Sequence, residues 1–415
     1  MKRTAYLRSA VSGATIAALT LLASGCGSDG GSPGDSSDPI KVGSVLDATG
    51  PLNIYGTGMV DATNLAVQDI NDNGGVLGRQ LELVSYDAQS DNSKYTQYAN
   101  TLTTRDQVSV LMGGISSASR EAIRPIADRN KTLYFYNEQY EGGVCDGNTI
   151  NTGAVPSQQL AALIPYAIQQ FGPRIAVIAA DYNFGHISTD WVKKYAADAG
   201  GEVVSTEFIP LDSSDFGSVT NGLQGTAPDV VVSLLVGGNH IAFYRQFASA
   251  GLGQSMNIVS TSFGLGNEQL QLSSQEGQGI VVAFPYFQEL DNPANQAFVD
   301  LWHQKYGADY GYITDSAVAV WNGWHLWAEA VEKAGSLDRD AVLKVLEAGV
   351  GFDAPSGQVT LNGASHHVTQ DVSIGQVNAN QGFDILETES AVAPAFENEV
   401  CDLIKHPDTN EQFTP

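Results

Sequence analysis

The stretch IKVGSVLDATGPLNIYGTGMVDATNLAVQDINDNGGVLGRQLELVSYD, residues 40–87, decides the fold class. Its first seven residues form a short apolar run bounded by turn residues, which is typical of a buried strand. Apolar residues then recur with helical spacing between positions 60 and 70, and the pattern stops at Gly74, where a helix C-terminus is expected. Residues 80–87 form a second strand pattern. Strand, helix and strand in this order predict a parallel pair joined by a helical crossover.

The same alternation continues along most of the chain. Strand patterns lie at 107–113, 133–136, 174–180, 202–209, 229–235 and 256–261, and helical patterns lie between them at 94–104, 119–130, 158–171, 188–201 and 239–251. Two such series predict two Rossmann-like α/β lobes with parallel sheets. A strand pattern at 279–284 is then followed by helical patterns at about 293–307, 312–334 and 337–349 and by antiparallel strand patterns between 356 and 386.

The first 25 residues have the pattern of an export signal. Basic residues within the first eight positions precede a mostly apolar run, and the segment ends in ASGC. LLASGC resembles a bacterial lipobox, so we expect Cys26 to become a lipidated N-terminus. The alternative is an ordinary secreted protein in which Cys26 is incidental. Residues 26–39 are rich in Gly, Ser and Asp and predict a flexible tether.

The net charge and the cysteines exclude some classes of partner. The net charge is −26 with only 20 Lys and Arg residues, which argues against binding to nucleic acid and against binding to anionic lipid through a polybasic patch.

Cys145 and Cys401 are the cysteines that follow Cys26. In an oxidising compartment such a pair predicts one structural disulfide, and two free thiols are the alternative.

Candidate binding residues follow the predicted strands, because ligands of open parallel sheets lie beyond the carboxyl ends of the strands. Ser116, Ser117 and Ser119 enter a helix, where hydroxyls and free N–H groups favour a carbonyl or anionic oxygen; plain helix capping is the alternative. The other strand ends carry aromatic side chains mixed with amides, hydroxyls and acids: Tyr136, Asn137, Glu138, Gln139, Tyr140, Asp181, Tyr182, Asn183, Phe184, Asn239, His240, Phe263 and Glu268. Together they predict a pocket for a small polar ligand between two lobes.

Catalytic signatures are missing from the sequence. It contains no nucleophile elbow, no complete dinucleotide fingerprint and no P-loop. His366 and His367 are neighbours on a predicted strand, so they would point to opposite faces and could not chelate a metal locally. We therefore expect no enzymatic activity, no cofactor and no metal site.

Long segments resemble the type I periplasmic binding proteins, the substrate-binding components of ABC importers. GPLNIYGTGMVDATNLAVQDINDNGGVLGRQLELVSYDAQSD is similar to the first lobe of the branched-chain amino acid binders. SSASREAIRPI, YFYNEQYEGG, AADYNFG and TDSAVAVWNGWHLWAEAVEKAGSLDRDAV resemble the urea and short-chain amide branch, which includes importer receptors and a cytoplasmic amide sensor. The resemblance covers residues 40 to about 388.

This resemblance implies a type I periplasmic-binding fold whose chain crosses between the lobes several times at the hinge. The expected divisions are a signal peptide at 1–25, a tether at 26–39, one lobe at 40–153 plus about 283–352, a second at 154–282 plus about 353–388, and a tail at 389–415. By position, the implied ligand contacts are Ile115, Ser117, Tyr136, Glu138, Tyr182 and the wall residue Phe184, to which the strand-end argument adds Ser116, Gln139 and Asn239.

Two of these positions depart from the family pattern. Ile115 stands where the amide sensor has an aromatic residue, and Glu138 stands where relatives have a small neutral residue. A carboxylate in a closing pocket needs donors or a positive charge, unless Glu138 points away from the pocket.

The implied function is that of a lipoprotein on the outer face of the cytoplasmic membrane. It would capture urea or a short-chain amide by lobe closure and deliver it to ABC permease subunits, with the lipid anchor as its membrane contact. The alternatives are a cationic guanidine-like or amidine-like ligand, an amino acid, or a receptor domain that senses the ligand.

Overall fold

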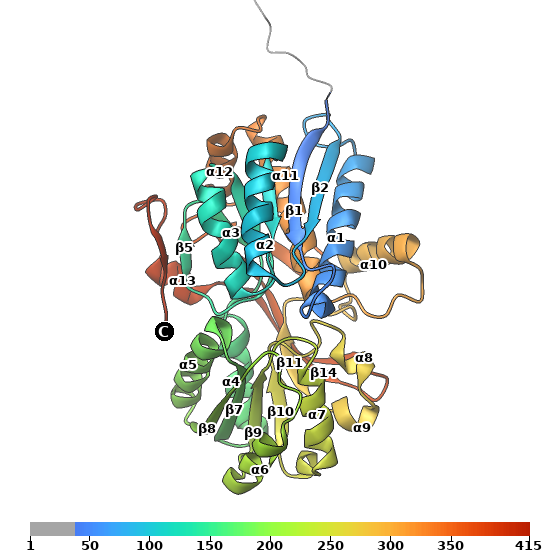
Figure 1. The fold of residues 1–415 in the computed structure, drawn as a ribbon, viewed down its shortest axis with the longest axis vertical. Coiled ribbons are helices and arrows are strands. Elements are labelled where there is room, and N and C mark those ends of the chain that lie inside the picture. Colours follow the sequence, from blue (N-terminus) through green and yellow to red (C-terminus); the bar gives the residue numbers. More distant parts are fainter. Residues whose placement is uncertain (1–37) are drawn as a thin grey trace, which may run out of the picture. The chain divides into compact units, whose positions relative to one another are not determined.

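A mostly parallel sheet organises residues 38–415, the part of the chain that the computed structural model describes (Figure 1). The predicted signal peptide, the lipidation site Cys26 and nearly all of the predicted tether lie outside these residues. The strands follow the order β2-β1-β3-β4-β6-β14-β11-β10-β9-β7-β8. The α/β fold class predicted from the sequence is confirmed.

The sheet has two halves. The first half contains β1 (Ile40–Leu46), β2 (Leu81–Asp87), β3 (Val110–Gly113), β4 (Leu133–Tyr136) and β6 (Thr149–Asn151). The second half contains β7 (Arg174–Ala180), β8 (Glu202–Ile209), β9 (Val230–Leu234), β10 (Asn257–Ser260) and β11 (Val281–Phe284). Within each half neighbouring strands are parallel, as helical crossovers require.

The strand β14 (His367–Val377) joins the two halves. Its first residue, His367, pairs with Asn151 of β6, and its second part, Ser373–Gln376, pairs antiparallel with β11. Three further antiparallel strands complete this region: β12 (Gly351–Ala354), β13 (Gly357–Asn362) and β15 (Phe383–Val392). One strand therefore belongs to both half-sheets. The lobe boundaries named above stay predictions.

Helices flank each half-sheet. With the first half lie α1 (Asn53–Asp72), α2 (Asn92–Asn100), α3 (Ser117–Arg129), α10 (Pro293–Tyr306), α11 (Asp315–Ala334) and α12 (Arg339–Glu347). With the second lie α4 (Gln159–Phe171), α5 (Asn183–Asp198), α6 (Gly217–Thr226), α7 (His240–Ser249), α8 (Glu268–Gln271) and α9 (Ser274–Gly277). A π-helical turn, Thr101–Asp106, follows α2, and a 3₁₀ turn, Leu252–Gln254, follows α7.

The strand β9 explains why its sequence is apolar at nearly every position. Val231 packs in the same core cluster as Phe243 of α7, whereas Val230 and Val232 pack with Leu163 of α4 on the other face. All three valines are fully buried. A strand covered on both faces has no solvent-facing side, so the polar–apolar alternation disappears.

Some boundaries differ from the sequence prediction. The helix α1 begins at Asn53, before the predicted pattern, and includes Gly56. A side chain at Gly56 would place its Cβ 2.0 Å from the Asp47 carbonyl oxygen, so this glycine permits a close approach rather than ending the helix. His366 lies outside β14 with a φ of 58°, so the prediction that it shares a strand with His367 is wrong.

The C-terminal segment packs against the first half. It contains α13 (Ala395–Val400) and β16 (Asn410–Gln412), and β16 pairs antiparallel with β5 (Val144–Asp146) (Figure 1). Cys145 of β5 forms a disulfide with Cys401. The sequence predicted this disulfide, and the alternative was two free thiols.

Candidate functional site

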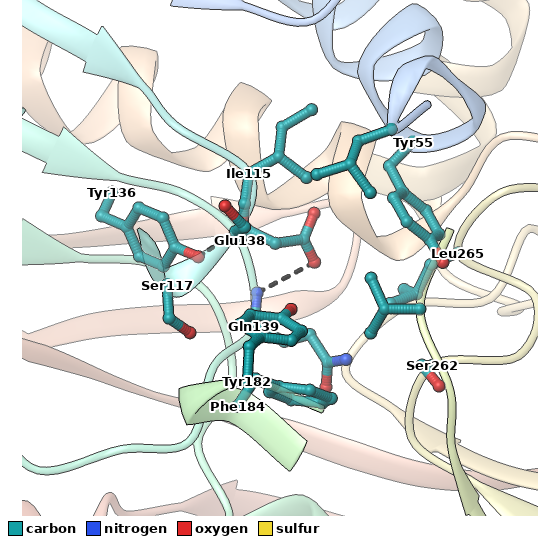
Figure 2. A pocket seen from close by; sticks show the side chains of 13 residues that line it. Tyr55, Ile115, Ser117, Tyr136, Glu138, Gln139, Tyr182, Phe184, Ser262 and Leu265 are labelled. Carbon is teal, nitrogen blue, oxygen red and sulfur yellow. Dashed lines mark hydrogen bonds between the residues drawn. The ribbon is translucent and has the colours of Figure 1, made fainter. Parts of the chain in front are cut away.

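A small cavity lies beyond the carboxyl ends of the strands and takes its walls from both half-sheets (Figure 2). Thirteen residues line it: Leu52, Tyr55, Ile115, Ser116, Ser117, Tyr136, Glu138 and Gln139 from the first half, and Tyr182, Phe184, Val236, Ser262 and Leu265 from the second. The cavity has a volume of about 30 Å³, inside a hollow of about 370 Å³ that includes its opening to solvent. The cavity volume corresponds to about two water molecules.

Most of the nine predicted ligand contacts meet at this cavity, whereas the wider strand-end candidates do not line it: Ser119, Asn137, Tyr140, Asp181, Asn183, His240, Phe263 and Glu268. All of the predicted ligand contacts line it except Asn239. The Asn239 side chain instead donates a hydrogen bond to the Leu211 carbonyl oxygen at 2.8 Å, and the residue borders a separate cavity. The prediction that Asn239 belongs to this site is therefore wrong, because its amide fastens a loop of the second half.

Five lining residues were missed by the sequence argument. Leu52 and Tyr55 lie where α1 starts beyond β1, a strand end whose following residues were not considered. Ser262 and Leu265 lie in SFGLGNE, in which Phe263 and Glu268 were chosen instead. Phe263 and Glu268 are both fully buried and support this loop from behind. The fifth residue is Val236, just beyond β9.

Glu138 carries the most unusual environment in the cavity. It is 6% exposed, and its carboxyl lies among the lining side chains (Figure 2). Its Oε1 accepts a hydrogen bond from the Gln139 N–H at 3.0 Å, and its Oε2 has no hydrogen-bond partner within residues 38–415. Burial raises the pKa of Glu138 to about 8, with Asp315 adding to the effect and the Ser316 hydroxyl opposing it. Glu138 is therefore mostly protonated at neutral pH, in contrast to the carboxylate assumed from the sequence.

Two hydroxyls of the first half already donate their hydrogens to protein groups. The Tyr136 hydroxyl donates to the Ile115 carbonyl oxygen at 2.6 Å, and the Ser117 hydroxyl donates to the Glu141 carboxylate. Towards a ligand, both hydroxyls can then act only as acceptors. Ser116 accepts the Ser119 N–H at 3.1 Å and so caps α3, as the plain capping alternative expected for one serine.

An ion pair behind the cavity fixes the charge of Glu141. Arg120 donates to Glu141 at 2.7 Å, and both side chains are fully buried. Burial by itself would raise the pKa of Glu141, but Arg120 outweighs burial and holds the pKa below its usual value. Arg120 thus pairs with Glu141, and through its Nε also with Glu121 at 2.9 Å.

The second half contributes an aromatic wall and a braced loop. The rings of Tyr182 and Phe184 lie 6.1 Å apart, at the start of α5. Glu268 accepts the Gly264 N–H at 2.6 Å and the Gly266 N–H at 3.1 Å, and its other oxygen lies 2.8 Å from His240 Nε2. These bonds hold the loop that presents Ser262 and Leu265.

One hydrogen bond crosses directly between the halves at the cavity. The Tyr55 hydroxyl of α1 accepts the Gly237 N–H at 2.9 Å. Because Gly237 follows β9 of the second half, this bond closes one side of the cavity.

Two features expected of other protein classes are not found in the part of the chain described. Residues 38–415 contain no group of three or more His, Cys, Asp or Glu side chains placed to hold a metal ion. Among the same residues, no helix combines the length and the apolar composition needed to cross a membrane.

Residues 39–382 match the family described as "Periplasmic binding protein". The chain belongs to this family. Among its relatives, this periplasmic binding protein is 23% identical over 348 residues to "Leu/Ile/Val-binding protein homolog 6" of Brucella melitensis, covering 82% of this chain and 88% of the relative. It is 25% identical over 332 residues to the "Leucine-, isoleucine-, valine-, threonine-, and alanine-binding protein" of Pseudomonas aeruginosa, covering 78% and 86%.

Solved structures share the fold. A solute binding protein of an ABC transporter from Rhodopseudomonas palustris, in complex with 3,4-dihydroxybenzoic acid, matches with a TM-score of 0.78 and 21% identity, covering 87% of this chain and 99% of that one. A leucine binding protein from Thermotoga maritima matches with a TM-score of 0.73 and 21% identity, covering 85% and 99%. The predicted type I periplasmic-binding fold is confirmed.

Family membership also bears on the functional predictions. It confirms that this periplasmic binding protein binds a solute rather than catalysing a reaction, and it implies an extracytoplasmic location. The relatives named above bind amino acids or a benzoate according to their names, and the urea and amide branch is not distinguished by these matches.

Proposed function

We propose that this periplasmic binding protein captures urea or a short-chain amide and delivers it to the permease of an ABC importer, from a lipid tether at Cys26. The observation that carries the choice of ligand is Glu138, a buried carboxyl that has one oxygen without a hydrogen-bond partner and no cationic partner among residues 38–415. In its protonated form it can donate one hydrogen bond and accept another. A primary amide or urea offers the complementary carbonyl oxygen and N–H group.

The neighbouring hydroxyls support the same ligand class. Since Ser117 and Tyr136 have donated their hydrogens elsewhere, they favour ligand N–H groups over ligand oxygens. Urea has four N–H bonds and an amide has two, and both are neutral. Their N–H groups can be satisfied without bringing a charge into the cavity.

The size and charge of the cavity argue against larger acids. The space of about 30 Å³ suits a ligand of a few non-hydrogen atoms better than a benzoate or leucine. No Arg or Lys lines the cavity within residues 38–415, so a carboxylate would face Glu138 without a cationic partner.

A cationic ligand or an amino acid is the second candidate, and two observations favour it. Within the described part of the chain Glu138 has no positive partner, and a guanidinium or ammonium group would supply one. The start of α3 lies at the cavity through Ser116 and Ser117, where helix N–H groups could receive an amino acid carboxylate.

The pH dependence of binding separates these candidates. Acetamide, urea, guanidine and leucine would be titrated calorimetrically into the wild-type protein and the Glu138→Gln variant between pH 6 and 10. A neutral amide that needs protonated Glu138 should bind equally at all pH values well below 8. Its affinity should then fall about tenfold per pH unit above that value.

A cation should show the opposite trend, with affinity rising until Glu138 is fully ionised. In Glu138→Gln the amide should keep most of its affinity and lose its pH dependence, whereas a cation should lose several kcal/mol. Amide binding that strengthens above pH 8, or no binding of urea and acetamide at any pH, would refute the proposal. A thermal-shift panel serves as a first screen, because a ligand at about 100 times its Kd stabilises by about 2.7 kcal/mol.

A further inference from the structure

The C-terminal segment, residues 393–415, lies beyond the part of the chain that matches the family, which ends at residue 382. It nevertheless contacts the loop 137–143, which carries Glu138 and Gln139 into the cavity. The strand β16 pairs with β5 directly after this loop, with Gln412 opposite Val144 and Asn410 opposite Asp146. The Cys145–Cys401 disulfide links β5 to the end of α13.

Gln412 connects the segment to the cavity in two steps. Its Nε2 donates to Glu141 Oε1 at 2.7 Å and to the Gly142 carbonyl oxygen at 3.0 Å. Glu141 in turn accepts the hydrogen of Ser117, which lines the cavity. The Arg120 guanidinium lies 3.4 Å from Gln412 Oε1, so Gln412 completes the surroundings of the buried ion pair.

Glu397 of α13 holds the next residue of the loop, Gly143. It is fully buried, and its two oxygens accept the Gly143 N–H at 3.0 Å and the Ser157 hydroxyl at 2.8 Å. Gly143 has a φ of 80°, and a side chain there would collide with the Phe413 backbone. The segment therefore encloses the loop closely.

The segment also contacts the second half-sheet's helices. The Phe396 ring packs edge-on against Trp191 of α5, with 4.8 Å between the ring centroids. The Trp191 indole N–H donates to the Glu141 carbonyl oxygen at 3.0 Å. The same helix begins with Tyr182 and Phe184 at the cavity, so residues 393–415 also contact an element that forms part of the second-half wall.

We infer that Gln412 and Glu397 are positioning residues of the ligand site, and that the C-terminal segment holds the loop 137–143 in its binding conformation. A loop that is already ordered loses less conformational entropy when the ligand binds, so the ligand binds more tightly. This inference rests on the proposed function only in using the same cavity, and it applies to any ligand bound there.

The test compares Gln412→Ala with Lys405→Ala on the full chain. Lys405 is an exposed residue of the same segment whose side chain pairs with Asp402 rather than with the loop, which makes it a matched control. Hydrogen exchange of residues 137–146 measures the loop directly, calorimetric titration with acetamide measures binding, and thermal unfolding measures global stability.

We expect Gln412→Ala to accelerate exchange in residues 137–146 and to raise the Kd for acetamide about tenfold, equivalent to about 1.4 kcal/mol. A lower thermal midpoint than that of Lys405→Ala, with exchange in residues 137–146 and Kd unchanged, would mark a purely structural role and overturn the inference. If Gln412→Ala and Lys405→Ala show the same hydrogen exchange in residues 137–146 and the same Kd for acetamide, the inference is overturned.

A second variant keeps the test decisive if Gln412→Ala does not fold. Cys145→Ser combined with Cys401→Ser releases the segment without touching Glu141, and should accelerate exchange in the same residues. Unchanged exchange in this variant also overturns the inference. If the wild-type protein binds neither acetamide nor urea, the proposed function fails, whereas the exchange comparison still decides whether the segment holds the loop.

Discussion

Replacing Glu138 by Gln should change how the stability of the unliganded protein depends on pH. The ordinary pKa of a glutamate carboxyl is 4.5, and burial raises the pKa of Glu138 to about 8 in the folded protein. Between these values the folded state binds this proton and the unfolded state does not. The stabilisation is therefore complete below about pH 4.5 and is lost as the pH rises through about 8.

The size of the effect follows from the shift. At 1.36 kcal/mol per pKa unit, moving the pKa from 4.5 to about 8 corresponds to roughly 5 kcal/mol. Glu138→Gln removes the titration but keeps the shape of the side chain. The variant should become progressively more stable than the wild type between pH 5 and pH 9, by up to roughly that amount.

Calorimetric unfolding of both proteins from pH 5 to pH 9, without ligand, measures this difference. Glu387→Gln is the matched control, because Glu387 is exposed and does not line the cavity. Asp315, whose pKa burial raises to about 7, titrates in both proteins and largely cancels. A difference that stays flat, or that favours the wild type at high pH, would show that Glu138 is ionised beside an unseen partner.

Three further substitutions test other parts of the site. Tyr55→Phe leaves the buried Gly237 N–H without its acceptor and should cost about 1–3 kcal/mol, measured by thermal unfolding. Glu268→Gln removes the charge that receives two loop N–H groups and faces His240; it should weaken binding of the titrated ligand and lower the thermal midpoint. Asn239→Ala should leave the Kd within about twofold of the wild type, because its side chain lies outside the cavity. A larger change in that Kd would restore Asn239 to the site.

The regular part of the fold could be predicted because its signals are local. Apolar spacing and glycine stops lie within each element, so strands such as β1 and β7 were predicted within a residue of their observed bounds. The three-residue strand β5 was not predicted, because it is defined by pairing with β16, more than 250 positions later. No local pattern carries that information.

The site was predictable in place but not in chemistry. The aromatic and polar residues after β3, β4 and β7 do meet at one cavity, since parallel strands bring their carboxyl ends to one edge. The protonation of Glu138 could not be predicted, because it depends mainly on how deeply the folded chain buries this carboxyl. The depth of burial of one side chain after a strand is decided by three-dimensional packing.

The shared strand β14 suggests how the protein could be made into an optical sensor. Because β14 pairs with a strand of each half-sheet, we expect an opening of the cavity to turn one half about it, with a displacement that grows with distance from that axis. Asn53 and Gly238 are exposed positions of opposite halves, near the Tyr55–Gly237 bond. The signal of dyes attached through cysteines at these two positions would change when the cavity opens, whereas the signal of a dye pair beside β14 would change little.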